Sequence, residues 1–220
     1  MHKRFGLALF RLVMGATVAT AIVTQYMQGA TRATFNPVNF FSYFTIESNI
    51  LAAFIFIVTG AALMTGIKLR RRSLIRGAAV LYMTITGIVY AILLSGIDAD
   101  LGLTMPWVNM VLHYLMPVAV LIDWFADPPE QKVPFKSALI WTIFPALYLF
   151  YSLIRGYGTG WYPYPFLNPE HSGYGGIITI SIGILVVSIG LIWVITKLSG
   201  RANSSPTPKN RLKSRTRRQK

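Results

Sequence analysis

Residues 41–67 read FSYFTIESNILAAFIFIVTGAALMTGI, an apolar stretch with a polar cluster near its start. A helix that spans ~30 Å of hydrocarbon needs about 20 predominantly apolar residues. The chain holds six such stretches. We expect spans at Phe5 to Met27, Phe41 to Ile67, Leu74 to Ile97, Pro106 to Ala126, Ser137 to Ile154 and Gly175 to Leu198. The sequence therefore predicts an all-α integral membrane protein, a six-transmembrane-helix bundle.

The composition supports this class and argues against others. Of the 220 residues 54% are hydrophobic and 13% charged, and the mean hydropathy is +0.52. A soluble domain of this size would tend to aggregate with such a balance. Although the pI is about 10.3, the basic residues form no stripe, so we expect no specific nucleic-acid partner. With no cysteine, thiolate metal sites and Cys nucleophiles are excluded, and we expect neither metal nor cofactor.

The placement of Lys and Arg predicts the topology. All of them except Arg32 and Arg155 lie before or early in the first span, in alternate connections, or after the last span. We expect a protein of the cell membrane, and the positive-inside rule then places both of its termini on the cytoplasmic side. The first span, preceded by Lys3 and Arg4, also has features of a cleaved signal peptide. Its length and the interrupting Arg11 favour a retained helix.

Two regions follow from the change in composition after Leu198. Residues 1–200 are expected to form one six-span membrane domain. Residues 201–220 contain eight basic residues and no acidic ones, and are expected to form a disordered basic cytoplasmic tail. Membrane lipids are the expected partners, and the tail would be attracted to their anionic headgroups.

The connection between the last two spans, residues 155–171, is rich in Gly, Pro and aromatic residues. The prolines and glycines argue against a regular helix. Its aromatic side chains suit the headgroup layer as an interfacial belt, and a lid over an outward-facing cavity is the alternative. At the opposite side of the membrane, Asp123 and Trp124 have the pattern of an interfacial anchor.

Polar side chains within the second span are candidates for function, because a buried polar group in a bilayer is costly. At 100° per residue Thr45, Ser48 and Asn49 share one helix face. Glu47 lies about 200° from Thr45 and so points elsewhere. An ion pair of Glu47 with Arg32 or Arg155, and a role as a titrating group, are both open.

In the fourth span Asn109 and His113 lie four residues apart and share a face. Thr45 lies ~6 Å along its helix from the outer side and His113 ~10 Å along its own, so the two lie at similar depths. If they meet, His113 can act as general base for a Thr45 nucleophile that attacks an ester. Ser48, Asn49 or Asn109 could then serve the oxyanion or orient the imidazole, and no third triad member is evident.

Each of these polar residues also has a structural interpretation. Ser and Thr in membrane helices commonly bond a neighbouring carbonyl, and Asn often joins two helices. A histidine such as His113 can likewise form a structural hydrogen bond to another helix.

The segment Phe41-Ser-Tyr-Phe-Thr45-Ile-Glu-Ser-Asn49, together with Asn109 and Leu112-His113-Tyr114, resembles the family of androgen-induced protein and androgen-dependent TFPI-regulating protein. Tyr162-Pro-Tyr-Pro-Phe166 and Asp123-Trp124 are similar to its bacterial six-helix relatives. The resemblance covers nearly the whole chain except the tail. It implies a membrane-embedded threonine hydrolase of fatty-acid esters, with Thr45 and His113 in the catalytic roles. Glu47, Ser48 and the short loops are features of the bacterial branch, whose substrate the family does not supply.

The preferred hypothesis is therefore a lipid ester hydrolase with Thr45 as nucleophile and His113 as base. A small proton-linked transporter that uses Glu47 and His113 is one alternative, and a non-catalytic membrane scaffold or sensor is another. A transporter should have polar residues through several spans to the cytoplasmic side. The polar residues here stop in the outer half, which disfavours transport.

Overall fold

A computed structural model describes residues 2–96, 104–129 and 131–199 of the protein. Helices make up 84% of these residues, and none of them lies in a strand. The all-helical prediction is confirmed. The expected tail at 201–220 lies outside the described residues.

Six helical segments are long and apolar enough to cross a membrane, as predicted. They are α1 (His2–Ala30), α3 (Phe44–Thr65), α4 with η1 (Arg72–Leu94), α6 with η2 and α7 (Pro106–Ala126), α8 with η3 and α9 (Phe135–Thr159), and α10 (Pro169–Leu198). The short helix α2 (Pro37–Phe41) precedes α3. The expectation of no regular helix in residues 155–171 is wrong for their Gly-rich start, because α9 continues to Thr159 and is capped by Gly160, whose φ is +71°.

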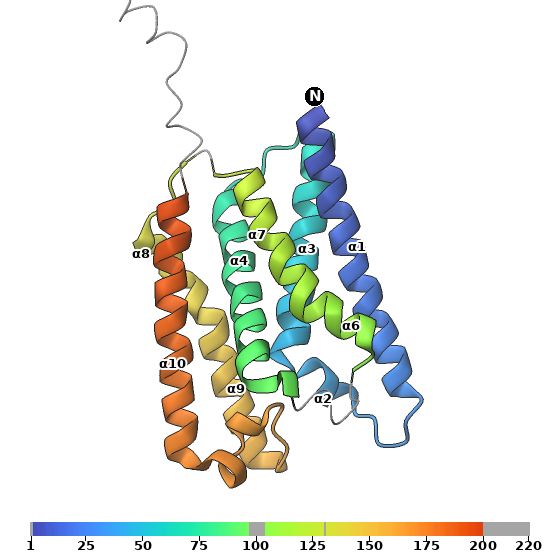
Figure 1. Ribbon diagram of the computed structural model, residues 1–220, viewed down its shortest axis with the longest axis vertical. Coiled ribbons are helices and arrows are strands. Elements are labelled where there is room, and N and C mark those ends of the chain that lie inside the picture. The colour runs from blue at the N-terminus through green and yellow to red at the C-terminus, as the bar shows by residue number, and fades with distance from the viewer. Residues whose placement is uncertain (1, 97–103, 130, 200–220) are drawn as a thin grey trace, which may run out of the picture.

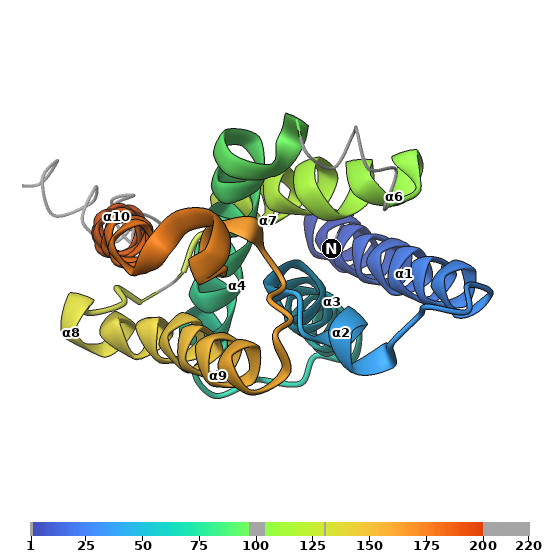
Figure 2. The ribbon, with the colours of Figure 1, turned by 90° about the horizontal axis from the view of Figure 1, so that it is seen from below.

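The six segments run up and down, so that α1 begins and α10 ends at the same end of the bundle (Figure 1). Helices α1, α3, α4 and α7 pack together, while α9 and α10 stand to one side (Figure 2). Residues 160–168, which join α9 to α10, cross the opposite end of the bundle beside the start of α3 (Figure 2). This crossing places the loop at the first turn of α3, where Tyr164 contacts Thr45.

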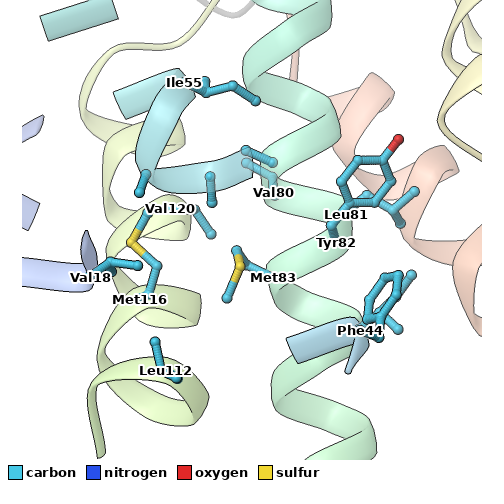
Figure 3. Packing of buried hydrophobic residues seen from close by; sticks show 14 of the residues in the cluster. Val18, Phe44, Ile55, Val80, Leu81, Tyr82, Met83, Leu112, Met116 and Val120 are labelled. Atoms are coloured by element: carbon cyan, nitrogen blue, oxygen red, sulfur yellow. The ribbon is translucent and has the colours of Figure 1, made fainter. Parts of the chain in front are cut away.

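Apolar side chains from α1, α3, α4 and α7 fill the space between these helices (Figure 3). Val18, Leu81 and Met116 are among those with no exposed surface. Two glycines bring α1 and α3 close together. A Cβ on Gly15 would lie 2.6 Å from Ile57, and one on Gly60 would lie 3.1 Å from the carbonyl oxygen of Ala8. Such close approach is typical of helix interfaces in membranes, which small residues permit.

A buried ionic cluster joins α1, α4 and α7 near the end where α1 begins. Asp123 accepts from Nε of Arg11 at 2.6 Å and from Nη2 of Arg76 at 2.7 Å, and all three side chains are at most 3% exposed. Asp127 pairs with Arg11, Arg72 and Arg76. The interpretation of Asp123 and Trp124 as an interfacial anchor is wrong, because both are buried and the guanidinium of Arg76 stacks on the Trp124 ring. Arg11 and Arg76, which entered the topology prediction as basic residues, are therefore also partners in buried ion pairs.

Candidate functional site

Thr45 lies in the first turn of α3, at the end of the bundle away from the ionic cluster. Tyr43 is the N-cap residue and its carbonyl accepts from Ile46 and Glu47, so the N–H of Thr45 lacks a partner within the helix. It donates instead to Oη of Tyr164 at 3.2 Å. The Thr45 side chain is 8% exposed. It is therefore fixed at the positive end of a helix dipole, where developing negative charge is stabilised.

The opposing side chains project from two π-helical turns, η1 (Tyr90–Leu94) and η2 (Val111–Leu115). Pro117 has no N–H, so the carbonyl of His113 cannot form its usual bond four residues on. In η2 the N–H of Met116 reaches back five residues to Val111. Gly87 on α4 permits close approach, since a Cβ there would lie 3.3 Å from Pro117. Single π turns of this kind frequently occur at functional sites, and here they bring His113 and Tyr90 face to face.

His113 bridges Thr45 and Asn109. Its Nε2 lies 3.3 Å from Oγ1 of Thr45, and its Nδ1 is hydrogen-bonded to Oδ1 of Asn109. Nδ2 of Asn109 donates in turn to Oη of Tyr90. The Tyr90 ring stacks on the imidazole at a centroid distance of 3.8 Å and an angle of 17°. Thr45 and His113 are thus in contact, which their similar depths in the membrane had made possible.

This order of partners fits one tautomer of His113. Because the amide nitrogen of Asn109 donates to Tyr90, its oxygen is the group that faces Nδ1. An amide oxygen only accepts, so in the matching tautomer Nδ1 carries the proton and donates a hydrogen bond to Asn109. Nε2 is left with a lone pair directed at the Thr45 hydroxyl. The order of hydroxyl, imidazole and amide resembles that of catalytic triads. Asn109 occupies the position next to the imidazole that sequence analysis left open among Ser48, Asn49 and Asn109.

Ser48 and Asn49 are fully buried beneath Thr45 and line neither of the cavities at the site. Oγ of Ser48 lies 3.0 Å from Oγ1 of Thr86 on α4. Nδ2 of Asn49 donates to the carbonyls of Thr45, at 2.9 Å, and of Leu112, at 3.2 Å. Both side chains tie α3 to neighbouring helices, as in their structural interpretation. They are not placed to contact an oxyanion or the imidazole.

Glu47 is half-buried on another face of α3, as the helix geometry predicts. Within the described part of the chain it forms no ion pair with Arg32 or Arg155. Arg155 instead donates to Oδ1 of Asn39 at 2.6 Å and stacks on Trp161. Glu47 lines neither cavity at the site.

Two cavities meet at Thr45. An apolar cavity of about 330 Å³ lies between α3, α4, α9 and α10 and includes Ile85, Leu149 and Leu185 in its lining. A more polar cavity of about 510 Å³ lies towards the outer loops and includes Arg32 and His113. Thr45 and Tyr164 line both. Thr45 therefore lies at the boundary between an apolar and a polar cavity.

Residues 160–168 contribute lining side chains to both cavities, a position compatible with the lid interpretation, and the interfacial belt stays a prediction. Tyr164 is 7% exposed and its hydroxyl lies 3.3 Å from Oγ1 of Thr45. Sequence reasoning missed Tyr164 and Tyr90 as site residues. Tyr164 could have been found from its place in the Pro-rich aromatic connection. Tyr90 could have been found because its hydroxyl is a polar group within an apolar span.

Across residues 2–96, 104–129 and 131–199 no three His, Asp or Glu side chains come together as metal ligands would. Comparisons of the chain with models of protein families, with curated proteins and with solved structures find no match.

Proposed function

We propose that this protein is a membrane-embedded lipid ester hydrolase in which Thr45 is the nucleophile, His113 the general base and Asn109 the orienting residue. The main support is the 3.3 Å separation of Oγ1 of Thr45 and Nε2 of His113, with Asn109 on the far side of the imidazole. Such mutual geometry of nucleophile, base and orienter is the first requirement of covalent acyl transfer.

The reaction proceeds by two acyl transfers. Oγ1 of Thr45 attacks the ester carbonyl while its proton passes to Nε2 of His113. The bond from the carbonyl carbon to the alkoxy oxygen then breaks, and the alkoxy oxygen takes that proton and leaves as the alcohol. Water attacks the acyl-Thr45 ester, giving its proton to His113. The carboxylic acid departs, and the proton returns to Oγ1 of Thr45.

The two cavities support a lipid as substrate. The lining of the apolar cavity, with Ile85, Leu149 and Leu185, suits an acyl chain, and its volume lies within the range of ligand pockets. The polar cavity would hold the alcohol portion and admit water. The substrate carbonyl would then lie at Thr45, where the cavities meet.

The proposal extends to family and topology. We place the chain with the bacterial six-helix relatives of the androgen-induced protein family, since the segments around Thr45, His113 and Tyr164 converge on one site. We also propose that the end carrying the ionic cluster and the basic tail faces the cytoplasm of a cell membrane, with the tail near anionic headgroups. The site then opens in the outer half of the bilayer.

The test is labelling of the purified full-length protein by a fluorophosphonate probe, with hydrolysis of a long-chain acyl ester in parallel. Thr45→Ala and His113→Ala should abolish both. Thr59→Ala is the matched control, because Thr59 is a buried threonine of α3 that bonds only main-chain oxygens of its own helix in the described structure. Labelling that survives both site substitutions would refute the assignment, and solute flux into proteoliposomes without ester cleavage would favour a carrier.

A further inference from the structure

The hydroxyl of Tyr164 makes two contacts with Thr45. It lies 3.3 Å from Oγ1 and accepts from the main-chain N–H at 3.2 Å. Tyr164 is 119 residues from Thr45 in the chain and belongs to the segment that crosses the end of the bundle. Tyr164 has no role in the two acyl transfers proposed above.

Aromatic packing fixes the Tyr164 ring in this position. Tyr43, the N-cap residue of α3, meets it edge-on at a centroid distance of 5.6 Å. Phe166 stacks on it at 5.1 Å with an angle of 5°. A 3-10 turn, η4 (Pro165–Leu167), follows, and the N–H of Leu167 donates to the carbonyl of Tyr164. The hydroxyl is therefore preorganised, which a donor to developing charge requires.

The surrounding hydrogen bonds leave the Tyr164 proton free to be donated. The N–H of Thr45 occupies a lone pair of Oη, and the Thr45 hydroxyl is directed to His113. In the resting site the Tyr164 hydroxyl can thus donate to Oγ1 of Thr45, 3.3 Å away. Burial raises the pKa of Tyr164 to about 12, so the hydroxyl keeps its proton at neutral pH and acts as a donor, not as a base.

We propose that Tyr164 donates the hydrogen bond that stabilises the oxyanion formed when Thr45 attacks the ester. This inference rests on the proposed hydrolase function. As the bond from Oγ1 to the carbonyl carbon forms, an electron pair moves to the carbonyl oxygen, and the Tyr164 hydroxyl turns from Oγ1 to that oxygen. The proton stays on Tyr164. When the carbonyl reforms and the alkoxy group leaves, the hydroxyl returns to Thr45.

Tyr164→Phe tests the proposal, because it keeps the packed ring and removes only the hydroxyl. Loss of one oxyanion donor typically lowers kcat about 10²–10³-fold. We expect a decrease of this size for a long-chain acyl ester, with KM within about 3-fold and an equally slowed fluorophosphonate labelling. Tyr151→Phe is the matched control, since its hydroxyl lies 2.7 Å from Oγ of Ser42 and makes no contact with Thr45.

The outcomes separate the two proposals. If Thr45→Ala abolishes turnover but Tyr164→Phe keeps the wild-type kcat, the hydrolase stands and the oxyanion role is overturned. If Thr45→Ala keeps full turnover, the hydrolase itself fails. A more active Tyr164→Phe would show that the hydroxyl blocks the site, which also overturns the role.

A second variant decides the question if Tyr164→Phe does not fold. Replacement of Tyr164 by 3-fluorotyrosine keeps the ring and hydroxyl but makes the phenol more acidic. The alkaline decline of kcat should then move to lower pH, because ionisation removes the donor. An unchanged pH profile would overturn the proposal.

Discussion

Oδ1 of Asn109 is hydrogen-bonded to Nδ1 of His113 from one helical turn away, so a single π-containing span supplies both the imidazole and its amide partner. Asn109 is itself held by its bond to Tyr90. The tautomer of His113 therefore depends on contacts remote from the nucleophile.

Asn109→Ala should slow turnover, because Thr45 and His113 remain but the imidazole is no longer oriented. General base catalysis typically contributes about 10²–10⁴-fold, and an unoriented imidazole would lose much of this in kcat. Asn109→Asp keeps an acceptor for Nδ1–H and should retain far more activity. The measurement is kcat for a long-chain ester in both variants. Equal activity of the two variants would contradict an orienting role for the acceptor.

Ser188→Phe should reduce hydrolysis of long acyl chains selectively. Ser188 is a buried residue of α10 that lines the apolar cavity, so a phenyl ring would occupy space proposed for the chain. We expect kcat/KM for a long-chain ester to fall about 10-fold or more, while that for an acetyl ester is retained. Val186→Phe, at a side chain 62% exposed on α10, is the control. A parallel loss on both esters would place the acyl chain elsewhere.

Asp123→Asn should destabilise the fold markedly. It removes the charge that faces Arg11 and Arg76, and breaking a buried ion pair in this way costs roughly 3–5 kcal/mol. Thermal unfolding in detergent would show the loss as a lowered Tm. Asp127→Asn should cost less, because the Asp127 side chain is 22% exposed. Similar small effects of both substitutions would mean that the cluster adds little to stability.

Low pH should weaken the buried ionic cluster by protonating Asp127. Burial opposes ionisation of this carboxyl, but Arg76, Arg11 and Arg72 outweigh it and lower the pKa of Asp127 below its ordinary value. A lowered folded-state pKa gives stability that is complete above the unfolded pKa, about 3.9, and is lost as the pH falls through the folded value. The Tm gap between wild type and Asp127→Asn should therefore narrow below about pH 4. A gap that stays constant to lower pH would contradict this linkage.

The six spans and the similar depths of Thr45 and His113 could be predicted because they depend on local properties, whereas the contact between the two residues could not. Apolar length defines a span, and the rise per residue gives the depth of each polar side chain. The same periodicity correctly separated Glu47 from the face of Thr45. These inferences need no knowledge of which helices are neighbours.

The remaining features of the site depend on tertiary packing. An ideal helix places Asn109 and His113 on one face, but it gives no sign of the π turns at Tyr90–Leu94 and Val111–Leu115, from which Tyr90 and His113 stack on each other. Tyr164 reaches Thr45 only because residues 160–168 fold back across the bundle. Ser48 and Asn49 share a face with Thr45, yet they lie deeper in the bundle, where they form hydrogen bonds to Thr86 and Leu112 of neighbouring helices.

The pairing of Arg11 with Asp123 also has a consequence in time. The two residues are 112 positions apart, so at 5–20 residues per second the partner of Arg11 is synthesised on the order of ten seconds later. An unpaired arginine within a membrane helix is costly, by roughly 2.5–3.5 kcal/mol even on insertion scales. During biosynthesis α1 is therefore incompletely stabilised until α7 arrives, and the arrival of Asp123 completes the assembly of the first four spans.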